Sequence, residues 1–157
     1  AQAYTREDGI VIDTFQVTTP DGASGVEPEQ RQRIRKQLEQ VFEGTTEIRD
    51  LFDKHQARWS RRRTPARTTP PELSVDNGIS DQYTVIDIFA HDEVGLLHRI
   101  TDALSALDLD ITTARISTQA DRVIDAFYVQ HKKSGKIEDD QELDAIRSKL
   151  LEKLADT

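Results

Sequence analysis

The residues with the clearest chemical potential lie in one short stretch, His91-Asp-Glu-Val-Gly-Leu-Leu97, between a β-rich run and a helical pattern. At such a strand-to-helix junction, free backbone N–H groups and the helix dipole suit an α-carboxylate. The Asp92 carboxylate suits an α-ammonium, and Gly95 lets a ligand approach the backbone. The pattern therefore predicts an amino-acid site. The structural alternative is that Asp92 only caps the helix and Gly95 only fills a gap between helix and sheet.

The predicted site extends beyond these two residues. Backbone groups of the neighbouring strand near Thr112 could recognise the ligand's side chain, and the remaining loop residues would contact the ligand. The predicted ligand-binding residues are Asp92, Val94, Gly95, Leu96, Leu97 and Thr112.

Other reactive residue types lack a usable pattern. The four histidines have no metal-ligand spacing, there is no cysteine, and no nucleophile–base spacing can be read, so we expect neither a metal nor a catalytic residue. Asp13 and Asp125 share strand faces with apolar residues, which favours a structural role over a ligand role. The basic cluster Arg61–Arg67 could contact phosphates. It lacks interleaved aromatic residues, so a solvated linker is favoured and nucleic acid is an unlikely partner.

Length and charge limit the organisation of the chain. Its 157 residues allow one ordinary domain or two small ones, and the net charge is −8. No run is long enough for a transmembrane helix, so we expect no membrane partner and take the cytoplasm as the default compartment. Residues 60–71 are basic, contain three prolines and read as a linker. The net charge of residues 1–71 is near zero, whereas residues 72–157 carry a large excess of acidic residues.

An internal repeat indicates two related halves. Val11-Ile-Asp-Thr-Phe-Gln-Val17 recurs as Val123-Ile-Asp-Ala-Phe-Tyr-Val129, and each copy is followed by a glycine turn and an amphipathic helix. We therefore expect a domain over 72–157, the linker over 60–71, and the later half of a related domain plus a further helix over 1–59.

The second copy is complete enough to predict a fold. Tyr83–Ala90, Leu109–Thr118 and Arg122–His131 have strand composition, and apolar stripes predict helices from Leu96 to Leu107 and from Leu143 to Leu154. The order βαββα, with both helices on one face of an antiparallel sheet, is an α+β ferredoxin-like arrangement. Its usual fourth strand is missing, and we expect residues 73–76 to occupy the vacant edge beside Tyr83–Ala90.

The first copy lacks counterparts of residues 83–113, because Ala1 already aligns with Ala114. We expect about 30 residues of strand, ligand loop and helix to lie upstream or to come from another chain, since a lone hairpin and helix bury too little apolar surface.

These residues resemble an ACT domain: the loop 91–97 after a strand, then Ile111-Thr-Thr-Ala-Arg-Ile-Ser-Thr118 and Val123–Val129. The variety most similar is the tandem pair at the C-terminus of the bacterial PII uridylyltransferase/uridylyl-removing enzymes, and Arg61–Asn77 fits the segment that joins their two ACT domains. The resemblance covers nearly the whole chain. Val94 departs from it, because the family often has proline or alanine there.

The resemblance implies a regulatory region that senses glutamine and controls uridylylation and deuridylylation of the signal protein PII in nitrogen regulation. It places the catalytic domains upstream, implies magnesium only there, and implies no cofactor for this chain. A second hypothesis, from a different class, is an interaction module without a ligand. In that case the edge strand 114–118 would pair the sheets of a homodimer.

Overall fold

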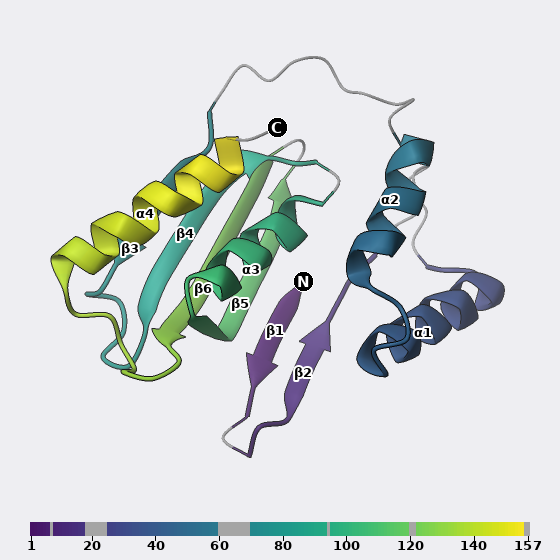
Figure 1. The fold of residues 1–157 in the computed structure, drawn as a ribbon, viewed down its shortest axis with the longest axis horizontal. Helices are drawn as coiled ribbons and strands as arrows, with labels where there is room; N and C mark the ends of the chain where they lie inside the picture. The colour runs from purple at the N-terminus through teal and green to yellow at the C-terminus, as the bar shows by residue number, and fades with distance from the viewer. Residues whose placement is uncertain (7, 18–24, 60–69, 94, 120–121, 156–157) are drawn as a thin grey trace. The chain divides into compact units, whose positions relative to one another are not determined.

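The computed structural model describes residues 1–6, 8–17, 25–59, 70–93, 95–119 and 122–155. It divides into two units, Ala1–Phe15 with Arg67–Thr157, and Gln16–Ala66, which are described separately. The described elements are β1 (Gln2–Thr5), β2 (Val11–Thr14), α1 (Pro28–Phe42), α2 (Ile48–Trp59), β3 (Glu72–Asp76), β4 (Thr84–His91), α3 (Leu96–Ala106), β5 (Leu109–Gln119), β6 (Arg122–His131) and α4 (Asp140–Ala155) (Figure 1).

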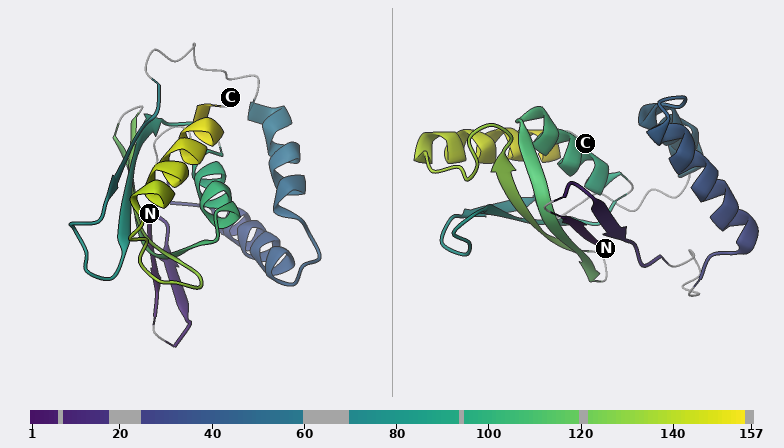
Figure 2. Two further views of the ribbon diagram at one scale, coloured as in Figure 1. Left: turned by 60° about the vertical axis from the view of Figure 1, so that its left-hand side comes forward. Right: turned by 90° about the horizontal axis from the view of Figure 1, so that it is seen from below.

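The first unit is an antiparallel sheet with strand order β2-β1-β5-β6-β4-β3. Helices α3 and α4 cover the same face of this sheet (Figure 2). The predicted α+β ferredoxin-like fold is confirmed, and the strands and helices expected after residue 72 form within a few residues of their predicted ends.

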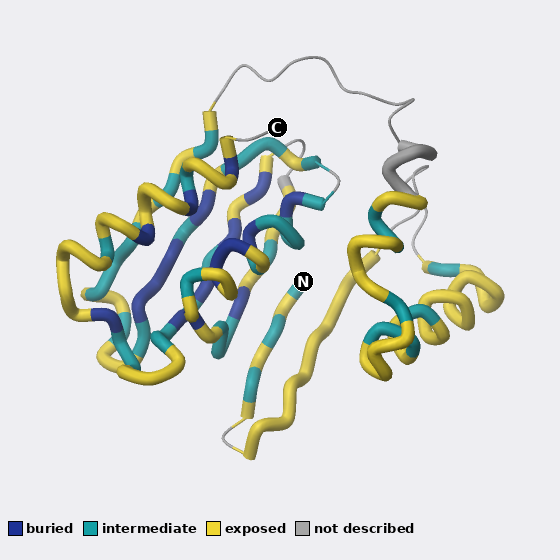
Figure 3. The backbone as a smooth tube through the Cα atoms, viewed as in Figure 1, coloured by how far each residue is buried: buried dark blue, intermediate teal, exposed yellow. Residues whose placement is uncertain are grey.

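The core lies between this sheet face and the two helices (Figure 3). Strand residues contribute to it at every second position, and helix residues at intervals of three or four, because these are the periods of the two structures. The fully or almost fully buried members include Ile86, Ile88, Phe127 and Val129 from strands, and Ile100, Leu104, Ile146, Leu150 and Leu154 from helices. Asp139 accepts hydrogen bonds from Gln141 N–H and Glu142 N–H, so it caps α4.

Strand β3 occupies the sheet edge that the βαββα core leaves open. It pairs with β4 from Glu72 opposite Phe89 to Asp76 opposite Val85. Leu73 and Val75 pack against the core from this edge. The prediction that residues 73–76 fill the edge is therefore confirmed: a segment that precedes the core replaces the usual last strand.

A partly buried polar network joins the turn after β3 to the start of β4 and to the segment between β6 and α4. Asn77 Nδ2 donates to the Ile137 carbonyl at 2.7 Å, and Asn77 Oδ1 accepts from Thr84 Oγ1 at 2.8 Å. The Ile137 N–H donates to Thr84 Oγ1 at 3.3 Å. Lys136 Nζ donates to the carbonyls of Asn77 and Ser80 at 2.8 and 2.7 Å. These bonds satisfy polar groups that burial would otherwise leave unpaired.

The opposite edge of the core is covered by β1. Ala3 lies opposite Ala114 and Gln2 opposite Arg115. The Ala1 amine donates to the Ile116 carbonyl at 2.8 Å, and the Ile116 N–H donates to the Ala1 carbonyl at 2.9 Å. The expectation that the edge strand at 114–118 pairs with a second molecule is therefore wrong over residues 114–116, because the same chain already fills that edge.

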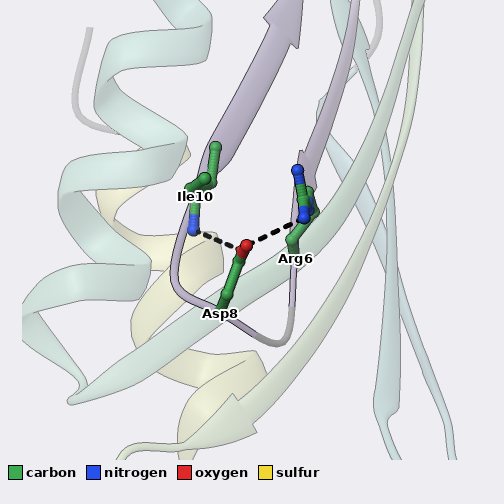
Figure 4. A network of polar contacts seen from close by, with 3 residues as sticks. All are labelled: Arg6, Asp8 and Ile10. Carbon is green, nitrogen blue, oxygen red and sulfur yellow. Dashed lines mark hydrogen bonds and ion pairs between the residues drawn. The ribbon is translucent and has the colours of Figure 1, made fainter.

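The hairpin that joins β1 to β2 is closed by polar contacts at its tip (Figure 4). Arg6 Nη2 lies 2.8 Å from Asp8 Oδ2, and Asp8 Oδ1 accepts from the Ile10 N–H at 3.2 Å. Gly9 in this turn has φ of 82°, which favours glycine. In the sheet, β1 of this hairpin lies between β2 and β5.

Apolar positions of β2 and of the residues after it are far more exposed than their counterparts in the second repeat. Val11 is 60% exposed and Phe15 61%, whereas Val123 is 4% and Phe127 0% exposed. In the second unit, helix α1 begins at Pro28, with a capping box formed by Glu27 and Gln30, and has no buried residue.

Replacing Asn77 with alanine tests the partly buried polar network. The change leaves the Ile137 carbonyl without its donor and removes the acceptor of the buried Thr84 hydroxyl, so we expect the free energy of unfolding to fall by about 1–3 kcal/mol. Urea denaturation followed by circular dichroism measures this. Ser74→Ala, at an exposed position of β3, is the control and should stay within about 0.5 kcal/mol of wild type. Equal effects of the two changes would contradict the stabilising role of the network.

Candidate functional site

The candidate site is the loop that follows β4. The strand ends at His91, and α3 begins at Leu96 with Gly95 as its N-cap residue. Gly95 has φ of 87°, a left-handed conformation, and no side chain caps the helix there. The interpretation of Asp92 as the helix cap is therefore wrong, because the helix starts later in the chain than that interpretation requires.

The loop residues divide into exposed and buried positions. Asp92 is exposed and Leu97 half-buried, whereas the Leu96 side chain lies in the core and can offer a ligand only its backbone. The Leu96 N–H donates to the Glu93 carbonyl at 3.2 Å, and the Arg99 N–H donates to the Gly95 carbonyl at 3.0 Å. Val94, also a predicted ligand residue, lies outside the described residues.

Thr112 does not lie beside this loop. Strands β4 and β5 run in the same direction, so the loop after β4 is near the end of β5, where Gln119 pairs with Arg122, itself opposite His91. Thr112 is near the start of β5, at a register shift, seven residues or roughly 23 Å of extended strand from Gln119. The expectation that Thr112 neighbours the loop is wrong, because β5 reaches the loop only at its other end.

Asp125 lies on the helix-covered face of β6 and is only 1% exposed. Its Oδ1 accepts a hydrogen bond from the Ser117 N–H at 3.3 Å. Burial raises the pKa of this carboxyl from 3.8 to about 6, while the Ser117 bond and the Ala1 ammonium lower it and the charge of Asp92 raises it further. The charge of Asp92 therefore acts on Asp125 from the loop, whereas Asp125 itself is buried and presents almost no surface to a ligand.

The Arg99 side chain extends from α3 to the same loop, where it adds a positive charge. Its Nη2 forms an ion pair with Glu93 Oε1. Its Nε is buried and has no hydrogen-bond acceptor among the described residues. Side chains on a helix point toward its N-terminus, which explains how a residue in the second turn reaches the loop.

The candidate site combines residues that the sequence singled out with residues that it did not. Asp92, Gly95, Leu96 and Leu97 lie together because they are neighbours along the loop and the start of α3. Asp125 had been assigned a structural role, and its nearness to Asp92 depends on strand pairing. Arg99 had a usable signal: a cation near the start of a helix opposes the helix dipole and so needs a partner.

The described residues contain no cluster of three or more His, Cys, Asp or Glu side chains that could hold a metal ion. Within the same ranges, no helix has the length and apolar character needed to cross a bilayer.

Residues 72–157, which hold the βαββα core and the loop, match the family "ACR9-like, ACT-like domain". The chain belongs to the ACT-like domain family. This agrees with the resemblance seen in the sequence.

Relatives extend the similarity to nearly the whole chain. A "Bifunctional uridylyltransferase/uridylyl-removing enzyme" of Gluconobacter oxydans (strain 621H) is 38% identical over 154 residues, which are 98% of this chain and 16% of that protein. Proteins of the same name from Bradyrhizobium sp. (strain ORS 278) and Azospirillum brasilense are each 34% identical, over 99% of this chain and 16% and 17% of their own lengths. The chain thus spans about a sixth of these relatives. No solved structure matches it.

The buried carboxyl of Asp125 predicts a pH dependence of stability. Because its pKa is higher in the folded than in the unfolded chain, its stabilising contribution is fully present below about pH 3.8 and is lost as the pH rises through about 6. We expect the free energy of unfolding to fall by roughly 2–3 kcal/mol more in wild type than in Asp125→Asn between pH 4 and pH 7.

Urea denaturation across that pH range measures the difference. Asp144→Asn, at an exposed position of α4, is the matched control and should follow wild type. A fall in Asp125→Asn as large as that in wild type would show that another group causes the dependence.

Proposed function

We propose that this chain is the amino-acid-sensing regulatory region of a cytoplasmic uridylyltransferase/uridylyl-removing enzyme. Its ligand is glutamine, and its role is to control uridylylation and deuridylylation of the signal protein PII. Relatives that bear this name match 98–99% of the chain at 34–38% identity, which supports the parent enzyme. The reactions themselves are assigned to other parts of the parent enzyme.

The observation that carries the sensing role is the start of α3, which has no side-chain cap, beside the exposed carboxylate of Asp92. The positive end of the helix dipole suits a carboxylate at this helix start. The Asp92 carboxylate suits an ammonium. A free amino acid carries both charges on one carbon, so it complements both features at once.

We further propose that the two halves of the chain are tandem ACT copies. The offset of 112 residues that aligns the two V-I-D-x-F-x-V motifs also aligns α1 with α4. It superposes Ile34, Leu38 and Phe42 on the buried Ile146, Leu150 and Leu154. Gln2 and Arg115 are equivalent positions in the strands before these motifs, and they lie opposite each other where β1 meets β5. Such a register is what a local two-fold axis between strands β1 and β5 produces.

This arrangement gives a ligand a route to influence the junction between the copies. Asp125 accepts from the Ser117 N–H, and it lies opposite Ile116, which exchanges two backbone hydrogen bonds with Ala1. A ligand that binds one arrangement of this junction more tightly than another would shift the balance between them.

The alternative, an interaction module without a ligand, receives less support. That alternative needs residues 114–118 to form an unpaired sheet edge, whereas β1 pairs with residues 114–116. No charge pattern on the remaining part of that strand points to a particular partner.

Titration calorimetry of the chain with L-glutamine tests the sensing role. We expect binding by wild type, and a loss of affinity of about tenfold or more in Asp92→Ala because the ligand ammonium loses a carboxylate. Gly95→Ala should weaken binding as well, since a Cβ forces the left-handed N-cap backbone to rearrange.

Gly135→Ala is the matched control for backbone strain. Gly135 has φ of 82° in the turn after β6, at the other end of the sheet, and a Cβ there would meet nothing within 4 Å. It should lose stability like Gly95→Ala and keep its affinity for glutamine. No heat with wild type, or equal affinities in all variants, would reject sensing at this loop.

A further inference from the structure

The Arg99 side chain is held in an electrostatically unfavourable place. A guanidinium near the N-terminus of a helix faces the positive end of the dipole. The helix begins without a side-chain cap, and the Glu93 carboxylate, just before the helix start, is the charge that pairs with the guanidinium.

Its hydrogen bonding is incomplete as well. Glu93 accepts from Nη2, whereas the buried Nε has no acceptor among the described residues. A buried donor without a partner is a cost that folded proteins usually avoid. Local conflicts of this kind concentrate at functional sites, where a ligand supplies what the fold lacks.

We propose that Arg99 binds the α-carboxylate of the amino-acid ligand, and that Glu93 is the internal carboxylate that occupies Arg99 until the ligand arrives. This inference rests on the proposed sensing function. A carboxylate has two oxygens and the guanidinium presents donors in a fork, so one ligand group can satisfy both Nε and an Nη atom. The opposite charges of the ligand then fall on Arg99 and on Asp92.

Arg99 thereby becomes a specificity residue. A compound with the same ammonium and side-chain amide but no carboxylate would bind the Asp92 carboxylate and leave Arg99 paired with Glu93. Arg99 therefore distinguishes α-amino acids from simple amines, which Asp92 alone cannot do.

The test pairs a residue change with a ligand change. Wild type, Arg99→Gln and the control Arg147→Gln, an exposed position of α4, are titrated with L-glutamine and with 4-aminobutanamide, which is glutamine without its α-carboxylate. Chemical-shift titration by NMR reads both strong and weak affinities. We expect Arg99→Gln to lower the affinity for glutamine by about 10- to 100-fold and to leave that for 4-aminobutanamide unchanged. Arg147→Gln should match wild type with both.

Each other outcome rejects a defined part of the hypothesis. Equal glutamine affinity in wild type and Arg99→Gln rejects the role of Arg99 and leaves the sensing function intact. Equal losses for both compounds show that Arg99 only supports the loop. No binding of glutamine by wild type rejects the sensing function itself, and this inference with it.

Glu93→Gln tests the internal competitor. Removing its charge frees Arg99 while keeping the side chain's shape, so the affinity for glutamine should rise several-fold, with no matching rise for 4-aminobutanamide. A lower affinity for glutamine would instead make Glu93 a residue that positions Arg99, and would overturn its role as competitor.

Discussion

The pairing of the two sheet edges is the constraint on which the rest of this structure depends. The βαββα core alone would expose unpaired N–H and C=O groups along β4 and along β5, and such edges invite association. Segments from outside the core cover both edges: β3 pairs with β4, and β1 pairs with β5. The first pairing is fixed by the network around Asn77, Thr84 and Ile137. The second ties the first half of the sequence repeat to the second.

The pairing of β5 with β6 sets the position of Asp125 relative to the candidate loop. The Ser117 N–H bond holds this carboxyl on the covered face of β6, where the charge of Asp92 acts on it. The Arg99 guanidinium pairs with Glu93 just before the start of α3, so charges of both signs lie along the same loop. Ile116, opposite Asp125, exchanges backbone hydrogen bonds with Ala1, which connects this part of the sheet to β1.

Much of the fold was predictable because the signals are local. Alternating residues in β4 and β6 and the stripes of α3 and α4 identify the elements, and Asp139 marks a helix start. The edge position of β3 also followed from the sequence. The predicted sheet lacked one strand, and residues 73–76 were the one spare strand-like segment that could supply it. The covering of β5 by β1 did not follow, because an edge strand carries no mark that tells a partner within the chain from one outside it.

The sequence by itself determined the element types, the repeated motif and the position of the loop between β4 and α3, because these depend on composition and spacing along a few residues. Only the tertiary structure decided that Asp92 is not the helix cap, that Thr112 lies at the other end of β5 from this loop, and that Arg99 pairs with Glu93 of the loop. The reason is physical: strand direction, register and the path of a long side chain bring distant residues together, and the local periodicity of the sequence determines none of these.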